Sequence, residues 1–261
     1  MTPAEKQARL ARLYDAEILP AYAARFAALL ARRIDVRPGA RVVEIGCATG
    51  ALTAELARRF DRASHLTALD ESPAFIVEAQ AQADARARLG GERAPQAEVA
   101  FEAHADLLAS IPIADRAADL VVSNLAIAGA PDPRAAVKEA ARLLAPGGVL
   151  AISGALRGTW AEFLDLFREV LRENGRLESL SAVDRYVAAL PDADRMGRWL
   201  EEAGLRRIEV DTARWEILFR SAREFFFAPL VELGPLAHWK QLSGRGDQMQ
   251  DVFFFTKEAI D

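Results

Sequence analysis

The sequence predicts an α/β fold in which a doubly wound, mostly parallel sheet carries helices on both faces. Short apolar runs alternate with longer segments of helical periodicity over most of the chain. The run at 118–122 is apolar without interruption, as expected for a strand buried on both faces of a parallel sheet. A glycine-containing turn also joins the first apolar run directly to a helical pattern, which is typical of a βα unit.

The first βα unit is predicted at residues 41–60. Val42, Val43 and Ile45 have strand character, a turn with a glycine at each end follows, and a helical pattern begins at Leu52. Backbone N–H groups left unpaired at such a helix start suit the polar part of a nucleotide-like ligand. A βα turn that binds nothing is the alternative interpretation.

Glu44 makes a ligand the better interpretation. It lies near the carboxyl end of a strand that is otherwise apolar, and a buried ionised group needs a partner, which a cationic ligand would supply. A dinucleotide fingerprint would require glycines at positions 46, 48 and 51, but this chain has Gly46, Ala48 and Ala51. The dinucleotide pattern therefore fails at two of its three positions.

At these residues the chain resembles the class I S-adenosylmethionine-dependent methyltransferases of the small-molecule type, whose loop reads Glu-Ile-Gly-Cys-x-Thr-Gly. The similarity runs from about Tyr14 to about Gly204, and Ala48 replaces the middle glycine of the family, where a small residue is tolerated. The resemblance implies S-adenosylmethionine as cofactor, S-adenosylhomocysteine as product and a seven-stranded sheet. It also implies that Glu44 binds the cofactor amino group and that the methionine moiety is cradled by Gly46, Cys47, Ala48 and Gly50.

The second strand is predicted at 65–69 and ends at two acidic residues, Asp70 and Glu71. Asp70 follows Glu44 by 70 − 44 = 26 residues, near the spacing of ~20 at which a carboxylate meets a ribose in nucleotide-binding folds. Ser72 and Pro73 then begin a helix that ends at Gly90-Gly91. The alternative is that Asp70 serves only as a capping residue.

Two further strands supply the remaining cofactor candidates. After the third strand, 98–103, the resemblance implies that Asp106 meets the adenine amino group and that Leu107 packs on the adenine ring. The fourth strand, 118–124, should bring Asn124 to the carboxyl edge of the sheet, facing the transferred methyl group. The Asn-Pro-Pro-aromatic motif of amino-methylating enzymes is absent after Asn124, which excludes that class of substrate.

Helical segments are predicted at both ends of this core. Residues 4–34 have helical periodicity, and Pro20 should divide them into two helices. By resemblance this segment forms a lid over the cofactor, with Tyr14 and Tyr22 as candidates; core tyrosines are an equal alternative. Helices are also expected at 160–174, 181–190, 193–203 and 221–242, with a sixth strand at 205–219. Residues 247–261 favour a helix, so either 252–256 is a short seventh strand or the native chain continues past Asp261.

The predicted domain plan has three parts: an N-terminal lid (1–36), a cofactor-binding core (37–155), and a C-terminal part of the core (156–261) with helical cap insertions at about 156–190 and 221–243. The cap is rich in aromatic residues, which suits an apolar or acyl acceptor. Trp160, Phe226 and Trp239 are its substrate-binding candidates, with ordinary cap packing as the alternative.

The composition of the chain bears on whether nucleic acid or a membrane could be its partner. The 261 residues include 33 basic and 38 acidic side chains, and the formal charge of −5 makes nucleic acid an improbable partner. No apolar run reaches the ~18 residues needed to span a bilayer. A single cysteine excludes an internal disulfide and suits a reducing cytoplasm. Cys47 is not assigned as a nucleophile, because its place in the glycine loop already explains a small residue there. No metal site is expected, and the oligomeric state is left open.

The sequence therefore predicts an enzyme that transfers a methyl group in line from S-adenosylmethionine to a small molecule. His104 and His238 lie near candidate site elements, but neither is assigned as a base, so the catalytic residues stay unknown. A non-catalytic S-adenosylmethionine-binding or protein-interaction module is the first alternative. A nicotinamide-dependent oxidoreductase is the second, and Ala48 and Ala51 oppose it.

Overall fold

The computed structural model describes residues 2–35, 37–90 and 96–261. The chain forms two compact units. The first comprises Met1–Gly154 and Met196–Glu209, and the second comprises Ala155–Arg195 and Val210–Asp261. Each unit is therefore built from two separate stretches of the sequence.

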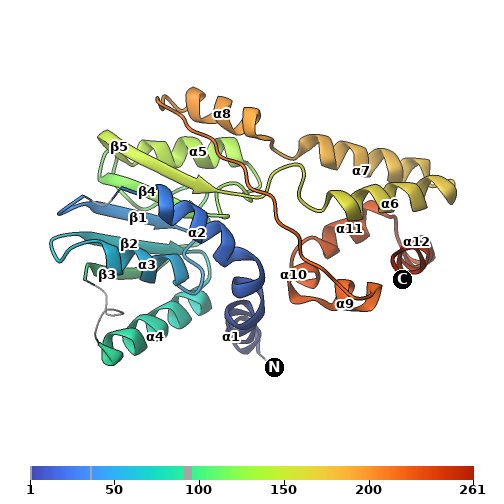
Figure 1. Cartoon of the computed structure of the whole chain (residues 1–261), viewed down its shortest axis with the longest axis horizontal. Coiled ribbons are helices and arrows are strands. Elements are labelled where there is room, and N and C mark those ends of the chain that lie inside the picture. The colour runs from blue at the N-terminus through green and yellow to red at the C-terminus, as the bar shows by residue number, and fades with distance from the viewer. Residues whose placement is uncertain (1, 36, 91–95) are drawn as a thin grey trace. The chain divides into compact units, whose positions relative to one another are not determined.

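The first unit contains a parallel five-stranded sheet (Figure 1). Its strands pair in the order β3-β2-β1-β4-β5, and every pairing is parallel. The order reverses between β1 and β4, and ligands of such sheets bind at the carboxyl ends of the strands beside that reversal. The strands are β1 (Arg41–Ile45), β2 (His65–Asp70), β3 (Glu98–Ala103), β4 (Ala118–Asn124) and β5 (Leu144–Ser153).

Helices cover both faces of this sheet, which confirms the doubly wound plan. On one face Val42, Leu66 and Leu120 pack with side chains of α2 (Ala24–Arg33) and α3 (Ala51–Arg59). On the other face their strand neighbours Val43 and Leu69 pack with α5 (Pro133–Arg142) and α8 (Ala193–Glu202). Each fully buried aliphatic side chain of this kind stabilises the fold by roughly 1.5–3 kcal/mol.

The N-terminal segment is helical throughout but changes its geometry. Helix α1 (Pro3–Leu13) begins with a capping box between Thr2 and Glu5, and it leads into the π-helix η1 (Tyr14–Ala23) and then α2. The expected division at Pro20 into two separate helices is wrong. Proline has no N–H and clashes with the carbonyl of the preceding turn, and the wider π-helical turn accommodates both effects without ending the helix.

Helix α4 (Pro73–Leu89) follows β2 on the α3 side of the sheet. Ser72 and Pro73 begin it as expected, although the Ser72 side chain makes no capping hydrogen bond. Gly90 ends the helix with a φ of 64°. Its partner in the predicted stop signal, Gly91, lies outside the described residues.

The second unit contains six helices and no strand among its described residues. Phe163, Phe167, Phe225 and Trp239 lie at the centre of its core, where the rings of Phe163 and Trp239 stack 4.2 Å apart. The helices expected at 160–174, 181–190 and 221–242 are confirmed. The elements are α6 (Ala161–Glu173), α7 (Leu177–Ala189), α9 (Ala222–Phe227), α10 (Pro229–Glu232), α11 (Leu236–Leu242) and α12 (Asp247–Ile260).

The strand count predicted from the sequence is too high. The sheet of the described chain has five strands, and residues 205–219, expected as the sixth, are irregular. Arg207 adopts a left-handed φ of 55°, which interrupts an extended strand, and residues 205–219 pair with none of the five strands of the described chain. Residues 252–256, the alternative seventh strand, lie within α12, so the helical interpretation of the C-terminal region is confirmed.

Candidate functional site

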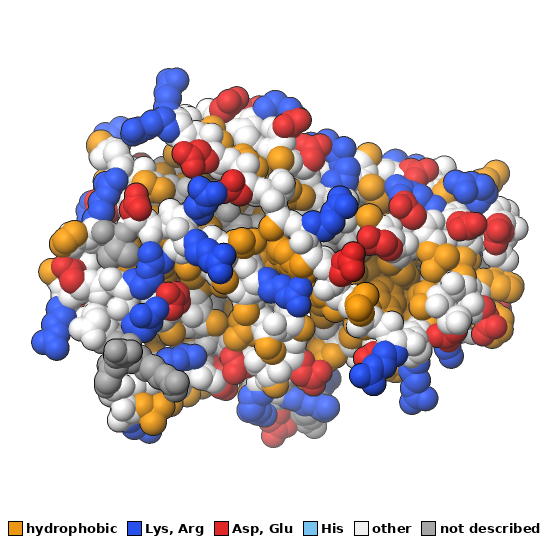
Figure 2. All heavy atoms as spheres, in the orientation of Figure 1, with side chains coloured by type: hydrophobic (Ala, Val, Ile, Leu, Met, Phe, Trp, Pro, Cys, Tyr) orange, Lys and Arg blue, Asp and Glu red, His pale blue; other side chains and the backbone are white. Residues whose placement is uncertain are grey.

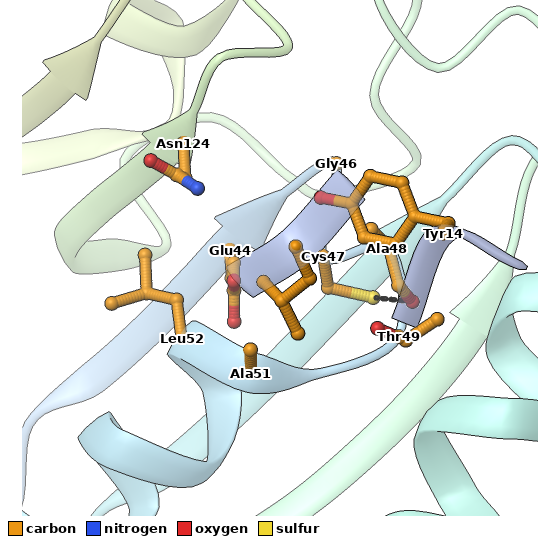
Figure 3. Close-up of a pocket in the computed structure, with 10 residues that line it drawn as sticks. Tyr14, Glu44, Gly46, Cys47, Ala48, Thr49, Ala51, Leu52 and Asn124 are labelled. Atoms are coloured by element: carbon orange, nitrogen blue, oxygen red, sulfur yellow. Dashed lines mark hydrogen bonds between the residues drawn. The ribbon is translucent and has the colours of Figure 1, made fainter. Parts of the chain in front are cut away.

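A small pocket lies at the carboxyl end of β1, inside the first unit (Figure 3). The glycine loop forms its floor, and the N-terminal π-helix contributes the side chains of Tyr14 and Leu19. Its free volume is only about 10 Å³. The remaining residues that line it are Glu44, Gly46, Cys47, Ala48, Thr49, Ala51, Leu52 and Asn124.

The loop from Gly46 to Gly50 owes its shape to its own packing. Gly46 and Gly50 have φ values of 75° and 78°, and a Cβ on Gly46 would stand 2.3 Å from the Cβ of Ala126. The N–H groups of Gly46 and Cys47 both donate to the carbonyl of Leu69, at 2.8 and 2.9 Å. These two N–H groups are therefore occupied within the protein, and Gly46 and Cys47 can offer a ligand only the shape of the loop surface.

Glu44 is the most buried charged group of the site. Its side chain is 1% exposed, and the Thr53 hydroxyl donates to its Oε2 at 2.6 Å. Burial raises the pKa of Glu44 to about 8, against the lowering effect of the Thr53 hydrogen bond. A carboxylate in this place gains most from a cation brought by a ligand.

Asp70 reaches the same loop from the end of β2. Its Oδ2 accepts the Ala48 N–H at 2.8 Å, and its Oδ1 accepts the Ser72 N–H at 2.9 Å. Burial raises its pKa too, although both hydrogen bonds act against that rise. Asp70 thus fixes the loop and the start of α4, and each carboxylate oxygen retains capacity for a further hydrogen bond.

The π-helix is attached to the loop by an acidic side chain that the sequence interpretation missed. Asp15 accepts hydrogen bonds from the Thr49 hydroxyl at 2.9 Å and from the Gln82 amide at 3.2 Å. The neighbouring ring of Tyr14 packs edge-on against Phe75 of α4, with 5.4 Å between ring centroids. In Figure 3 the Tyr14 ring stands beside Ala48 and Cys47.

The two lid tyrosines differ in their relation to the pocket. Burial, followed by the negative charges of Asp70 and Glu44, raises the pKa of Tyr14, so its phenol stays protonated. Tyr22 does not line the pocket, and its ring packs against Phe26 at 5.0 Å. Burial raises the pKa of Tyr22 to about 12.

Asn124 lines the pocket but uses both ends of its amide within the protein. Its Nδ2 donates to the Ala23 carbonyl at 3.2 Å, and its Oδ1 accepts the Ser153 hydroxyl at 2.7 Å. The sequence interpretation missed Ser153. The signal for it was present, because Asn124 and Ser153 end adjacent parallel strands and pair directly in the β4–β5 register.

Other candidates lie away from this pocket. Glu71 and Asp106 are exposed, and Leu107 is buried in the core with Val43 and Leu69. The Cys47 thiol contacts the Ala48 carbonyl oxygen at 3.7 Å, and burial raises its pKa, which leaves it a poor nucleophile. His104, whose ring nitrogen lies 3.2 Å from the Ala105 carbonyl oxygen, is likewise outside the pocket.

The predicted substrate aromatics belong to the second unit. Trp239 is fully buried, whereas Trp160 and Phe226 are partly buried against the same core. Trp160 meets Trp239 edge-on at 5.7 Å, and Phe226 meets Phe163 at 6.0 Å. His238 packs on Tyr186 with 4.7 Å between ring centroids. These contacts account for the side chains as core packing, and their role toward an acceptor stays a prediction.

Features that would indicate other partners are not found in the described part of the chain. No helix among those residues is long and apolar enough to cross a membrane. On the face drawn in Figure 2, basic and acidic side chains are interspersed, so that face has no continuous basic surface of the kind that follows a phosphate backbone.

Known proteins resemble this chain over the region that forms the site. Residues 43–152 match the family described as "Methyltransferase domain". A malonyl-[acyl-carrier protein] O-methyltransferase of Hahella chejuensis is 39% identical over 148 residues, which cover 57% of this chain and 46% of that protein. A demethylmenaquinone methyltransferase of Corynebacterium urealyticum is 30% identical over 190 residues, which cover 71% of each protein.

The solved structure of the YcgJ protein from Bacillus subtilis has the same fold, with a TM-score of 0.54, 15% identity and 87% of each chain covered. This chain spans less than half the length of the Hahella chejuensis protein and most of the length of the Corynebacterium urealyticum protein. The matched region contains β1, the glycine loop and the strand ends that surround the pocket. The chain belongs to the class I S-adenosylmethionine-dependent methyltransferases.

Proposed function

We propose that this protein transfers the methyl group of S-adenosylmethionine to a small-molecule acceptor. One observation carries the proposal: the buried Glu44 and the partly buried Asp70 contact or adjoin the glycine loop, and no Lys or Arg is among the residues that line the pocket beside that loop. The cofactor carries a positive amino group and a sulfonium, so it supplies a cation that would favour the ionised form of these carboxyl groups.

The residues of the site suit the separate parts of the cofactor. Glu44 binds the amino group, and Asp70, with Glu71 beside it, binds the ribose hydroxyls. Asp106 and Leu107 mark the adenine end, and because Leu107 is buried in the core its contribution is to shape that end from behind. Gly46, Cys47, Ala48 and Gly50 form the surface under the methionine moiety, with Asn124 and Tyr22 as further candidates.

The protein contributes alignment more than chemistry. S-adenosylmethionine, when bound, supplies a methyl group that its sulfonium already activates. The chain has to hold an acceptor atom about 3 Å from that carbon, in line with the bond that breaks, and exclude water from it. Tyr14 and Leu19 cover the loop and serve the exclusion of water. A base is needed only for an acceptor that arrives protonated, and no residue is assigned to that role.

The acceptor belongs to the small, apolar or acyl compounds. The names of the two relatives describe methylation of an acyl-carrier-bound malonyl group and of demethylmenaquinone. We assign acceptor choice to the helical cap within 156–261, through Trp160, Phe226 and Trp239, and cofactor binding to the core at 37–155 with the lid at 1–36. Tyr14 is the acceptor candidate of the lid.

Calorimetry with S-adenosylhomocysteine tests the cofactor half of the proposal. We expect a dissociation constant in the micromolar range, about −8 kcal/mol, and a loss of most of that affinity in Glu44→Gln, which removes the charge and keeps the shape. Binding of NADH with no response to S-adenosylhomocysteine would instead support an oxidoreductase and overturn the proposal.

Mass spectrometry tests the catalytic half. The protein is incubated with methyl-labelled S-adenosylmethionine and with carboxylates, phenols and acyl thioesters, and a labelled product identifies the acceptor. A protein that binds the cofactor tightly but yields no labelled product from any class would favour the non-catalytic binding module.

A further inference from the structure

Glu44 has one hydrogen-bond partner within the described chain, the hydroxyl group of Thr53. The Thr53 Oγ1 donates to Glu44 Oε2 at 2.6 Å, and both residues are only 1% exposed. No hydrogen bond from a described residue reaches the other carboxylate oxygen, Oε1. Glu44 lines the pocket, and in Figure 3 its side chain points toward the start of α3. One oxygen is therefore held inside the protein, and the other is left for a ligand.

Thr53 lies behind Glu44 and does not line the pocket. It belongs to the first turn of α3, whose preceding residues, Ala51 and Leu52, do line it. Its helix neighbours Leu52 and Leu56 are buried in the apolar core. A hydroxyl group in such surroundings costs free energy unless it is hydrogen-bonded. Thr53 and Glu44 are thus two buried polar groups that satisfy each other.

The Thr53 hydroxyl favours the ionised form of Glu44. A donated hydrogen bond stabilises a carboxylate more than a neutral carboxyl group. Burial is the main influence on the pKa of Glu44 and raises it, whereas the Thr53 hydrogen bond acts in the opposite direction. The same bond restricts a flexible side chain before any ligand arrives, which reduces the entropy that binding has to remove. Both effects favour a cationic ligand.

We propose that Thr53 is a positioning residue for cofactor binding: its hydroxyl holds one oxygen of Glu44, so that the other oxygen receives the amino group of S-adenosylmethionine. Thr53 does not touch the cofactor, and its whole contribution passes through Glu44. The inference rests on the proposed function, because it takes that amino group as the partner of Glu44.

Three other ionisable groups surround this pair. After burial and the Thr53 hydrogen bond, the charge of Asp70 at the end of β2 is the next influence on the pKa of Glu44, and it raises that pKa. Burial, followed by nearby negative charges, raises the pKa of Tyr14 and of Cys47, so both stay protonated near neutral pH. These groups are the same in two proteins that differ only at Thr53, so a difference between their pH profiles belongs to the Thr53–Glu44 pair.

Calorimetry measures the affinity of the full chain for S-adenosylhomocysteine, which carries the same amino group, from about pH 6 to pH 8.5. Wild-type affinity should increase with pH as Glu44 ionises in the free protein, because the amino cation binds the ionised form. Thr53→Val nearly keeps the shape and removes the donor. We expect its dissociation constant at pH 7 to be about 5- to 50-fold higher than that of the wild type, and its increase in affinity to move to higher pH. Thr53→Ser restores a hydroxyl and should return both quantities toward the wild-type values.

Thr256→Val is the matched control. Thr256 is also buried in a helix, α12, but it belongs to the second unit, where its hydroxyl donates to the Val252 carbonyl at 2.7 Å. This substitution should leave the dissociation constant within about 2-fold of wild type and the pH profile unchanged. Melting temperatures of all variants are measured alongside. If Thr53→Val does not fold, Thr53→Ala, which removes the same hydroxyl and has high helix propensity, carries the comparison.

The outcomes separate this role from the proposed function. A folded Thr53→Val or Thr53→Ala protein with wild-type affinity overturns the positioning role and leaves the function standing. An equal loss of affinity at every pH, or a loss that Thr53→Ser does not reduce, identifies Thr53 as a packing residue and overturns the role in the same way. A wild-type protein that binds no S-adenosylhomocysteine overturns the proposed function, and the role of Thr53 with it.

Discussion

At the scale of single residues, the site is organised by two acids whose surroundings disfavour their charge. Glu44 contacts one hydroxyl donor and lies beneath α3, while Asp70 accepts two backbone N–H groups. Burial raises the pKa of both. Both side chains therefore favour their neutral form in these surroundings, and a neighbouring cation would favour the ionised form.

The pH dependence of stability should report the ionisation of Glu44. Its pKa of about 8 in the folded protein lies above the ordinary carboxyl value. Between about pH 4.5 and 8 the folded state keeps a proton that the unfolded state has lost, so this group's contribution to stability falls as the pH rises through that window. In urea unfolding at pH 5, 6.5 and 8, the free energy of unfolding of the wild-type protein should decrease by an amount on the order of 2–4 kcal/mol. Glu44→Gln, which cannot ionise, should not show this decrease. Glu71→Gln, at an exposed position, should retain the wild-type slope, and an equal slope in all three proteins would contradict the assignment.

The ribose assignment is tested at Asp70. Asp70→Ala removes charge-assisted hydrogen bonds, and we expect S-adenosylhomocysteine affinity to fall by ~1.5–3 kcal/mol in calorimetry. Because Asp70 also holds Ala48 and Ser72, the melting temperature is measured alongside. Asp70→Asn keeps an acceptor for one of those N–H groups. Compared with Asp70→Ala, it should regain more of the lost stability than of the lost S-adenosylhomocysteine affinity. Wild-type affinity in Asp70→Ala would remove the ribose role.

At the scale of elements, the strand–loop–helix unit of residues 41–59 depends on how closely the glycine loop approaches the next layer. A Cβ at position 46 would meet Ala126 of the segment after β4, and one at position 50 would lie 3.1 Å from the Cβ of Ala79 in α4. The loop is therefore packed between Ala126 and Ala79, and this packing by itself requires glycine at positions 46 and 50, whether or not a ligand binds.

Gly46→Ala should be destabilising for this reason. The new methyl group would stand 2.3 Å from the Cβ of Ala126, and the residue would keep a φ of 75° that L-residues rarely adopt. We expect a loss of ~2–4 kcal/mol in urea unfolding. Gly158→Ala is the control, since a Cβ there has no neighbour within 4 Å, and it should change stability by less than ~0.5 kcal/mol. Similar effects of the two substitutions would contradict the packing account.

Much of this element pattern was readable from the sequence. The first four strands form at or near the ranges predicted for them, and the placement of Glu44, Asp70 and Asn124 at strand ends follows from parallel order alone. The prediction failed at 205–219, where a sixth strand was expected, because Arg207 adopts a left-handed φ that the sequence does not signal. It also missed the bond between Asp15 and Thr49, because no periodicity links residues 34 positions apart that meet only after the segment folds over the loop.

At the scale of the whole molecule, cofactor residues and aromatic cap residues lie in different compact units, so their contributions should be separable by mutation. Trp239→Ala removes a fully buried indole that stacks on Phe163 and should lower stability by ~3–5 kcal/mol. Phe227→Ala, at a ring that is 69% exposed, is the control and should change it by less than ~0.5 kcal/mol. Thermal and urea unfolding measure both.

The milder cap variants address function. Trp160→Ala and Phe226→Ala alter partly buried rings, and each should reduce turnover or acceptor affinity while S-adenosylhomocysteine binding stays within ~0.5 kcal/mol of wild type. Loss of cofactor affinity together with fold stability in both would identify the aromatic cluster as packing alone. Variants that keep full turnover would place the acceptor site elsewhere, with Tyr14 as the next residue to change.

The chain passes from one unit to the other three times, after Gly154, Arg195 and Glu209. During synthesis, the five strands and α5 are complete before any of the second unit emerges, so the sheet has its hydrophobic faces ready for α8 as soon as that helix is made. Residues 155–195, by contrast, leave the ribosome without three aromatic partners of Phe163 and Phe167, namely Phe225, Trp239 and Phe253, which come only with residues 210–261. The last residue itself contributes, since the Asp261 carboxylate accepts the Ala222 N–H at 2.7 Å. The aromatic face of α6 is therefore incompletely covered in the growing chain until residues 210–261 have been made, and the two stretches of the second unit depend on each other for a common core.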